Sequence, residues 1–194
     1  VLLVDSFTPR GTQNECGNGS SGVSEVNARR YDAYGAYNYL SGQAFVKAER
    51  IGVLGWSHGA SSTMATMDVA NIAGGVKPFK AAVAFYPGCA AALQRAKYQL
   101  NAPLLLLAGG NDDWTPADRC QSLQTAVLAR QPQARFELET FGGAYHGFDG
   151  TAPVTERSGI PNGRRHGTVT VGGDPAAREA AFAKLAAWLD APHP

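Results

Sequence analysis

The pentapeptide Gly55-Trp56-Ser57-His58-Gly59 has the form G-x-S-x-G, in which a serine stands between two glycines. It directly follows the run from Arg50 to Leu54 and precedes the small and apolar residues from Ala60 to Met67. A serine on a tight strand-to-helix turn is a nucleophile for acyl transfer, and a Cβ two residues before or after it would collide with its neighbours. The pattern also arises by chance in glycine-rich loops, so its strand and helix context is what favours Ser57 as a nucleophile.

A serine hydroxyl is a weak nucleophile at neutral pH, so it needs a base within hydrogen-bond reach and an acid that orients the base. Of the four histidines, His146 is the one in a loop directly after a predicted strand, whereas His166 and His193 lie in polar segments nearer the C-terminus. His58 is needed for its peptide N–H, which opens the next helix and points one oxyanion donor toward the serine. We therefore predict His146 as the general base.

The acid is expected in the loop after the preceding strand, which contains Asp112 and Asp113. Asp112 stands four residues before Pro116, which opens the next helix, and this is the usual placement of the acid in hydrolases whose serine and histidine resemble Ser57 and His146. We therefore favour Asp112, and Asp113 could cap the loop or meet solvent. The resulting chain order of serine, aspartate and histidine is that of the α/β-hydrolase fold, and it differs from the order in chymotrypsin-like and subtilisin-like enzymes.

Short apolar runs that alternate with helical patterns must position these residues. Continuous rather than alternating apolar strands, separated by helices, predict a parallel sheet that is buried on both faces, with the site at the carboxyl ends of the strands. The expected fold class is α/β, an α/β-hydrolase-like and mostly parallel sheet with helices on both faces. Strands are predicted at 1–5, 50–54, 80–86, 104–108 and 135–141, and helices at 24–45, 58–71, 117–130 and 175–189, with Ser24 and Asp174 as N-caps. The polar residues 150–173 are interpreted as one long excursion.

Length and composition predict a single domain over residues 1–194, since 44% hydrophobic and 17% charged residues are ordinary for a globular protein. The formal net charge of +1 gives no basic field for nucleic acid, and Arg29-Arg30 and Arg164-Arg165 are interpreted as solvated pairs. The apolar runs are too short to span a bilayer, so no membrane partner is expected. No metal-ligand spacing is visible, and no cofactor is expected. The compartment, whether cytoplasmic, periplasmic or secreted, is left open.

Three cysteines allow at most one internal disulfide. Cys89 follows one predicted strand and Cys120 begins the helix after the next strand, which places both near the carboxyl edge of neighbouring strands. A bridge between them requires Cα atoms within about 7 Å. At a larger separation, Cys89 would be a small core residue.

Six segments of the chain carry a resemblance to a known family: Val4–Gly11, Tyr31–Tyr34, Gly55–Gly59, Phe85–Cys89, Asp112–Pro116 and Ala144–Asp149. Together, and in this order, they resemble the dienelactone hydrolase family over almost the whole chain. The resemblance implies hydrolysis of a small-molecule ester or lactone, with Ser57 attacking, His146 moving the proton and Asp112 orienting His146. The lactonases that gave the family its name use a cysteine nucleophile, so Ser57 favours ordinary esters.

The chain departs from that family at its N-terminus. In the family, a strand and then a glycine-rich loop precede the segment that resembles Val1–Gly11, and this loop supplies the second oxyanion donor. These are missing, so we interpret the chain as N-terminally truncated. Either a further segment, upstream or from another chain, fills the gap, or the sheet closes up and an N–H of Phe7–Gly11 substitutes. We expect that a further segment fills the gap. Val1–Asp5 and Arg50–Leu54 would then not pair with each other and would lie about two inter-strand spacings apart, roughly 10 Å.

Substrate contacts are predicted at the strand ends. Arg10 would bind a substrate carboxylate through both guanidinium nitrogens, or else form a structural salt bridge. The aromatic candidates for an apolar acyl site, any of which would equally suit the core, are Trp56, Tyr86, Trp114, Tyr145 and Phe148.

Three functions fit these features. The first is a cofactor-independent serine esterase or lactonase. The second is an acyltransferase or peptidase on the same fold, since an acyl-enzyme does not dictate which nucleophile resolves it. The third, motivated by the missing oxyanion segment, is a catalytically degenerate hydrolase domain used for binding.

Overall fold

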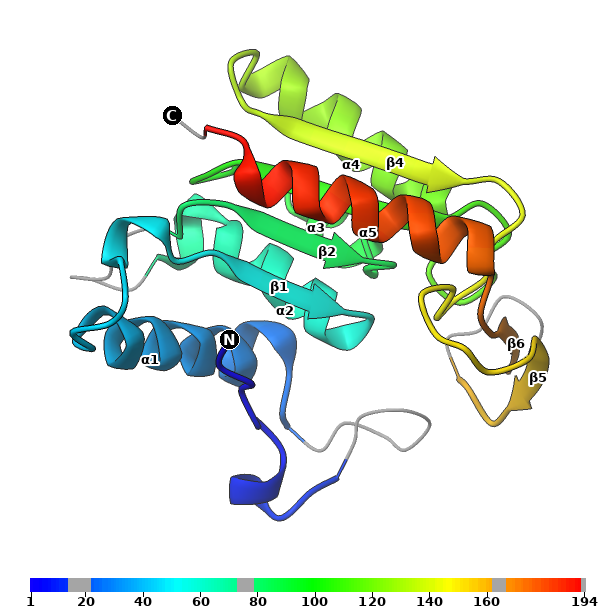
Figure 1. Cartoon of the computed structure of the whole chain (residues 1–194). Helices are drawn as coiled ribbons and strands as arrows, with labels where there is room; N and C mark the ends of the chain where they lie inside the picture. Colours follow the sequence, from blue (N-terminus) through cyan, green and yellow to red (C-terminus); the bar gives the residue numbers. More distant parts are fainter. Residues whose placement is uncertain (14–21, 73–78, 162–166, 193–194) are drawn as a thin grey trace.

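The central sheet consists of four parallel strands in the order β1-β2-β3-β4 (Figure 1). The computed structural model describes residues 1–13, 22–72, 79–161 and 167–192. The strands are β1 (Val53–Trp56), β2 (Ala82–Phe85), β3 (Leu104–Gly109) and β4 (Phe136–Phe141). Each neighbouring pair is parallel, so all four strands end at one edge of the sheet. The predicted parallel α/β architecture is therefore confirmed.

Helices cover both faces of this sheet, as predicted. They are α1 (Arg30–Ser41), α2 (His58–Met67), α3 (Ala90–Gln94), α4 (Ala117–Arg130) and α5 (Pro175–Asp190). The side chains of α5 pack with one face of β2 and β3, and those of α1, α2 and α4 pack on the other face (Figure 1). Every residue of β2 and β3 is buried, which explains why their sequences are apolar without alternation. Among the described helices, none is both long and apolar enough to cross a membrane.

The helix starts follow the predicted caps more closely than the ends do. The Asp174 side chain accepts the Ala177 N–H at the start of α5, and the Ser24 side chain accepts the Asn27 N–H. The turn that Ser24 caps is a π-helix, η2 (Glu25–Arg29), before α1 begins. Short 3₁₀ turns complete the elements: η1 (Thr8–Arg10), η3 (Ala48–Arg50) and η4 (Val69–Asn71).

The strand predicted at Val1–Asp5 is wrong. These five residues have no strand assignment, and all are exposed to solvent. A strand obtains its ladder hydrogen bonds from a neighbour, and no described residue pairs with this segment. Its apolar composition alone does not form a strand.

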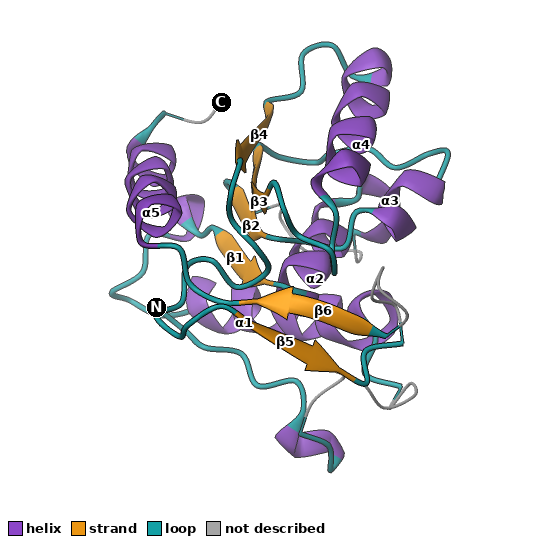
Figure 2. Cartoon of the chain, turned by 90° about the vertical axis from the view of Figure 1, so that its right-hand side faces the viewer, coloured by secondary structure: helices purple, strands orange, loops and turns teal. Residues whose placement is uncertain are grey.

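Two further features lie near the edge of the sheet at which the parallel strands end. The predicted excursion contains an antiparallel hairpin, β5 (Thr155–Ser158) and β6 (Thr168–Val171), which lies beyond the carboxyl ends of the parallel strands (Figure 2). The Cys89–Cys120 disulfide is confirmed, with Cα atoms 5.1 Å apart. It connects the start of α3 to α4, whereas Cys16 lies outside the described residues.

Candidate active site

Ser57 lies on the turn between β1 and α2 with a strained backbone. Its φ of 52° is in the region that L-residues rarely adopt, and its N–H donates to the Phe85 carbonyl oxygen. The two elbow glycines differ. A Cβ on Gly55 would collide with the Gly59 carbonyl and lie 2.7 Å from Thr63 Oγ1, whereas a Cβ on Gly59 would meet only the end of the Arg29 side chain at 3.5 Å. The predicted steric need therefore holds for Gly55 and is wrong for Gly59.

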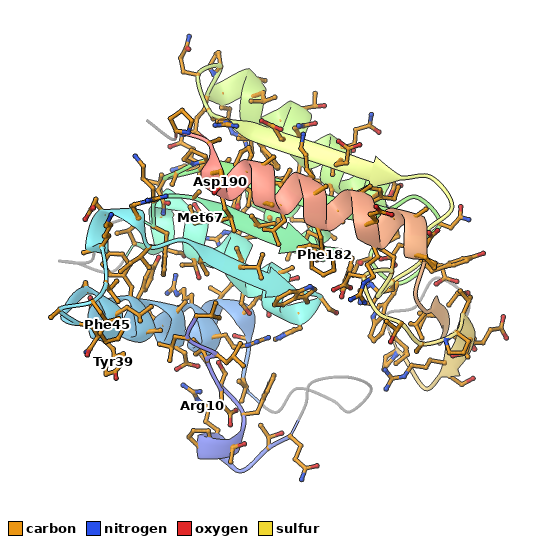
Figure 3. The ribbon with its side chains drawn as sticks, viewed as in Figure 1. Arg10, Tyr39, Phe45, Met67, Phe182 and Asp190 are labelled. Atoms are coloured by element: carbon orange, nitrogen blue, oxygen red, sulfur yellow. A yellow bond between two sulfur atoms is a disulfide. The ribbon has the colours of Figure 1, made fainter. Side chains whose placement is uncertain are left out.

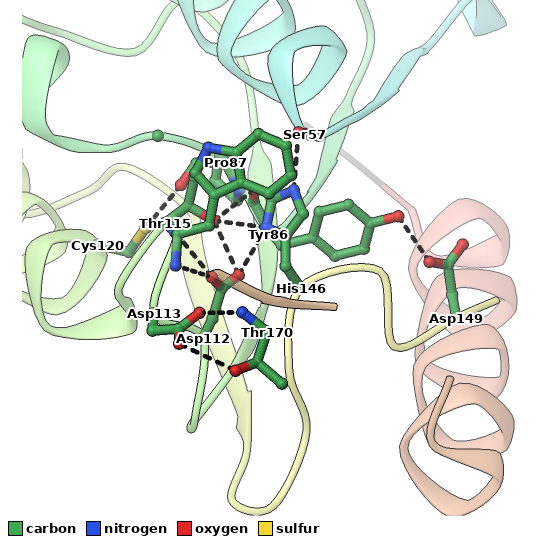
Figure 4. Close-up of polar contacts among 12 residues, drawn as sticks. Ser57, Tyr86, Pro87, Asp112, Asp113, Thr115, Cys120, His146, Asp149 and Thr170 are labelled. Atoms are coloured by element: carbon green, nitrogen blue, oxygen red, sulfur yellow. Dashed lines mark hydrogen bonds and ion pairs between the residues drawn. The ribbon is translucent and has the colours of Figure 1, made fainter. Parts of the chain in front are cut away.

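A continuous hydrogen-bond chain joins the predicted nucleophile, base and acid (Figure 4). Ser57 Oγ lies 2.8 Å from His146 Nε2, and His146 Nδ1 lies 2.8 Å from Asp112 Oδ2. His146 and Asp112 are buried, while Ser57 is half-buried. With the proton on Nδ1 donated to Asp112, Nε2 has a lone pair for the serine hydroxyl.

The Asp112 carboxylate is held by hydrogen bonds on both oxygens. Oδ1 accepts the N–H groups of Trp114 and Thr115 at 2.8 and 2.7 Å. Oδ2 lies 2.8 Å from Thr115 Oγ1 as well as from the histidine. Thr115 Oγ1 also lies 3.0 Å from both the Tyr86 carbonyl oxygen and His146 Nδ1. Thr115 belongs to the segment that the sequence singled out, but its bridging position follows from the turn and was not predicted.

Two aromatic rings flank the imidazole of His146. The ring centroids of Tyr86 and Trp114 each lie 4.6 Å from that of His146. Tyr86 has a positive φ of 41°, and its hydroxyl donates to Asp149 Oδ1 at 2.6 Å. Burial, together with the Asp149 carboxylate, raises the pKa of the Tyr86 phenol far above its usual value. The phenol therefore remains a neutral donor, and the two rings confine the base.

His58 opens α2, so its N–H is one of the N-terminal donors that have no acceptor within the helix. Its side chain points elsewhere: Nδ1 accepts from Arg29 Nη1 at 2.7 Å, and Nε2 lies 3.4 Å from Glu25 Oε2. The hydrogen bond from His58 lowers the pKa of Glu25, and nearby positive charge adds to this effect. The ring is thus held against η2, while the main-chain N–H lies at the start of α2.

The loop around η1 has no N–H to spare for a second oxyanion donor. The N–H groups of Phe7 and Thr8 donate to the Asp5 carboxylate. Those of residues 10, 11 and 12 donate to the carbonyl oxygens of Phe7 and Thr8, and residue 9 is a proline. The alternative that an N–H of Phe7–Gly11 substitutes for the missing donor is therefore wrong.

Arg10 forms the structural salt bridge rather than a substrate contact. Its guanidinium binds the Asp32 carboxylate through two contacts of 2.8 Å and donates to the Ser6 carbonyl oxygen at 2.7 Å. Arg10 is the last residue of η1, which lies away from the carboxyl ends of the strands (Figure 3). Because both terminal guanidinium nitrogens are already bound to the chain, we do not retain Arg10 as a carboxylate ligand.

The remaining aromatic candidates are dispersed. Phe148 is fully buried in the core beneath α5, so it is a packing residue. Tyr145 is half-buried, and no contact among the described residues ties its side chain to Ser57 or His146. Trp56 stacks on Phe85 with centroids 5.7 Å apart and remains 39% exposed. Of all the aromatic candidates, Tyr86 and Trp114 are the two whose rings contact the His146 imidazole.

β1 has an open edge within the described residues. Val53 and Ser57 donate their N–H groups to carbonyls on the β2 side, so the alternating main-chain groups of Leu54 and Trp56 face away from β2. A groove of about 340 Å³ follows this edge between β1, the N-terminal residues 2–4, and residues of α1 and α2. No described hydrogen bond joins Val1–Asp5 to β1, so the sheet has not closed up.

Other predicted features give no further chemistry here. His166, His193 and the Arg164-Arg165 pair lie outside the described residues. In the described ranges, no group of three His, Cys, Asp or Glu side chains is arranged to hold a metal ion.

Comparison with known proteins gives a clear family. The sequence profile of the dienelactone hydrolase family matches residues 18–192. A search of curated proteins found no significant match.

Solved structures share the fold at low sequence identity. A proposed dienelactone hydrolase from Klebsiella pneumoniae subsp. pneumoniae is 19% identical with a TM-score of 0.59, and the match covers 87% of this chain and 62% of that one. A thermophilic esterase from Thermogutta terrifontis is 18% identical with a TM-score of 0.60, over 87% of this chain and 65% of the other. Dipeptidyl peptidase 4 from Porphyromonas gingivalis is 19% identical with a TM-score of 0.59, over 85% and 22%. This chain therefore spans less than two thirds of the length of these proteins.

Proposed function

The chain belongs to the dienelactone hydrolase family, and we propose that it hydrolyses carboxylic esters or lactones through an acyl-enzyme on Ser57. The observation that carries this proposal is the pair of 2.8 Å contacts from Ser57 Oγ to His146 Nε2 and from His146 Nδ1 to Asp112 Oδ2. A serine nucleophile favours ordinary esters over the lactones for which the family is named.

In the acylation step, Ser57 Oγ attacks the ester carbonyl carbon while His146 Nε2 takes the hydroxyl proton. The carbonyl π electrons move to oxygen, and the His58 N–H donates to the oxyanion. Asp112 stabilises the imidazolium that forms and keeps its orientation. When the intermediate collapses, the bond to the alcohol oxygen breaks and His146 gives its proton to that oxygen, which leaves as the free alcohol.

In the deacylation step, water takes the place of the alcohol. His146 Nε2 removes a proton from water as the water oxygen attacks the acyl carbon, and a second tetrahedral oxyanion forms. The bond to Ser57 Oγ then breaks, and the serine oxygen takes the proton from His146. The carboxylic acid is released with the three side chains in their starting protonation states.

The oxyanion hole needs a second donor, and we propose that a further extended polypeptide segment on the open edge of β1 brings it. The groove beside β1, the unpaired edge positions Leu54 and Trp56, and the occupied N–H groups of the η1 loop all support this idea. Removing one oxyanion donor typically costs about 3 kcal/mol of transition-state stabilisation. These 194 residues alone should therefore be a slow enzyme rather than an inactive one.

The decisive test combines labelling with turnover. A fluorophosphonate probe should label Ser57 covalently in the wild-type chain and leave Ser57→Ala unlabelled, with Ser61→Ala as a matched control that still labels. Hydrolysis of p-nitrophenyl esters of varied chain length should depend on Ser57. Labelling of another serine would contradict the assignment of the nucleophile. Turnover only with an added amine or alcohol acceptor would indicate an acyltransferase, cleavage only of peptide substrates a peptidase, and absence of all activity a binding domain.

A further inference from the structure

The second aspartate of the acid loop is bound to the β5–β6 hairpin. Asp113 Oδ1 accepts the Thr170 N–H at 2.7 Å, and Asp113 Oδ2 accepts from Thr170 Oγ1 at 3.1 Å (Figure 4). Thr170 is buried in β6, whereas every residue of β5 is exposed. The hairpin is therefore attached to the sheet mainly through β6. The N–H and the hydroxyl of Thr170 both bind the Asp113 carboxylate.

β6 in turn holds the main chain of His146. Val171 forms an isolated parallel bridge with His146, and the Gly172 N–H donates to the His146 carbonyl oxygen at 3.0 Å. The residue directly after β6 is closely packed, because a Cβ on Gly172 would lie 2.5 Å from the Val154 Cα. A shift of β6 would thus move the backbone that carries the imidazole.

We propose that Asp113 is a positioning residue, whose two hydrogen bonds to Thr170 hold β6 in place and so fix the His146 backbone. We call this pair of hydrogen bonds the latch. The two consecutive aspartates then have separate roles, since Asp112 orients the ring of His146 and Asp113 acts through Thr170 on its main chain. This inference rests on the proposed function of His146 as the base. Displacing a catalytic group by about 1 Å can reduce the rate about 100-fold, so a latch remote from the reacting atoms affects turnover.

The latch depends on hydrogen bonds and not on the negative charge. An asparagine at position 113 can accept the Thr170 N–H through its carbonyl oxygen and donate its amide N–H to Thr170 Oγ1. An alanine can do neither. If Asp113 instead acted through its charge, as an acid or as an electrostatic partner of the imidazolium, asparagine would fail as badly as alanine.

The experiment compares kcat and KM for p-nitrophenyl butyrate in Asp113→Ala, Asp113→Asn and Thr170→Val, with Asp190→Ala as a control for loss of an exposed carboxylate. Asp113→Ala should lower kcat roughly 10- to 30-fold with KM within about twofold of wild type. Asp113→Asn should retain at least about a third of kcat, and Thr170→Val should lower kcat about threefold. An equal loss in the alanine and asparagine variants, or no loss in either, would overturn the latch.

Amide hydrogen exchange tests the latch without relying on activity. In Asp113→Ala the Gly172 amide should exchange at least about tenfold faster than in wild type, because β6 is no longer held. Unchanged exchange at Gly172 would refute the latch even if activity fell. If the wild-type chain shows no turnover and no labelling of Ser57, the proposed function fails, while the exchange result still decides the latch. If Asp113→Ala does not fold, Thr170→Val gives the same comparison with one bond removed.

Discussion

The proposed acid–base half of the site lies around Asp112 and His146, and the proposed nucleophile half lies around Ser57 and β1. Both halves lie at the same edge of the sheet, but they are built differently. In the first half, both carboxylate oxygens of Asp112 are hydrogen-bonded, and the imidazole lies between two rings. In the second half, no strand of the described ranges pairs with the free edge of β1, and Leu54 and Trp56 are 36% and 39% exposed. The difference teaches that, under the proposed mechanism, the described residues organise the groups for proton transfer more completely than the donors for an oxyanion.

The largest effect should come from Asp112→Asn. This variant tests whether activity depends on the His146 tautomer that the Asp112 contact favours. The asparagine amide would donate to His146 Nδ1 and move the ring proton to Nε2, where it blocks acceptance from Ser57. We expect kcat for p-nitrophenyl butyrate to fall about 10⁴-fold. Asp118→Asn, on the exposed first turn of α4, should be near wild type. A loss below about 100-fold would mean that another group orients the base.

The two elbow glycines give a sharp contrast within the nucleophile half. Gly55→Ala places a methyl group against the Gly59 carbonyl and Thr63, so the free energy of unfolding should fall by about 3 kcal/mol. Gly59→Ala meets only a flexible arginine end, and should change it by no more than about 0.5 kcal/mol. Urea denaturation measures both. Equal costs would show that the turn excludes side chains on both sides of Ser57.

Amide exchange should reveal the open edge of β1 directly. The N–H groups of Val53 and Ser57 donate to the β2 side, so they should exchange at least about 100-fold more slowly than those of Leu54 and Trp56. Slow exchange at all four positions in the chain alone would mean that the edge is already covered. In that case the contrast between the two halves would disappear.

Thr115→Val tests how much the bridging hydroxyl adds to the acid–base half. Valine keeps the shape of threonine but removes the hydroxyl that lies within hydrogen-bond distance of the Tyr86 carbonyl oxygen and of Asp112 Oδ2, which should lower kcat about 10-fold. Thr115→Ser keeps the hydroxyl and should recover most of the activity. Similar losses in serine and valine would assign the effect to packing of the methyl group.

The smallest effect concerns pH and the Glu25–His58 contact of the nucleophile half. Because the folded pKa of Glu25 is lowered, its stabilising contribution is present above its unfolded pKa of about 4.3 and is lost as pH falls through the folded value. Glu25→Gln should therefore reduce the free energy of unfolding at pH 7, by at most about 1 kcal/mol, and reduce it by less as the pH falls below the unfolded pKa. The same difference at pH 7 and below the unfolded pKa would contradict this origin.

The sequence predicted the elements whose signals are local. The continuous apolar runs of β2 and β3, the bounds of α4 and the Asp174 cap all rest on short-range preferences, and the structure agrees with them. Ser57, Asp112 and His146 could be selected because each follows a strand in a fold whose strand ends meet. Val1–Asp5 failed for the opposite reason, since a strand depends on a neighbour that a local pattern does not supply.

Most of the contacts that the sequence did not reveal are long-range. Thr170 lies 57 residues from Asp113, and only the fold brings the two together. Arg10 could equally have met a substrate or an acid of the chain, and Asp32 decides between them 22 residues away. The bridging position of Thr115 depends in part on the carbonyl oxygen of Tyr86, 29 residues away. The positive φ of Tyr86 has no sequence signature beyond the proline that follows it.

Because of the Cys89–Cys120 bridge, we expect the melting temperature of this protein to depend on the redox state of the compartment in which it is produced. The bridge closes a loop with a sequence separation of 31, and in the chain-entropy view such a cross-link stabilises the folded state by roughly 3–4 kcal/mol. A reducing cytosol would deliver the dithiol, and an oxidising compartment the bridged form. Two preparations of one sequence, with the same Ser57, should therefore melt about 10 °C apart.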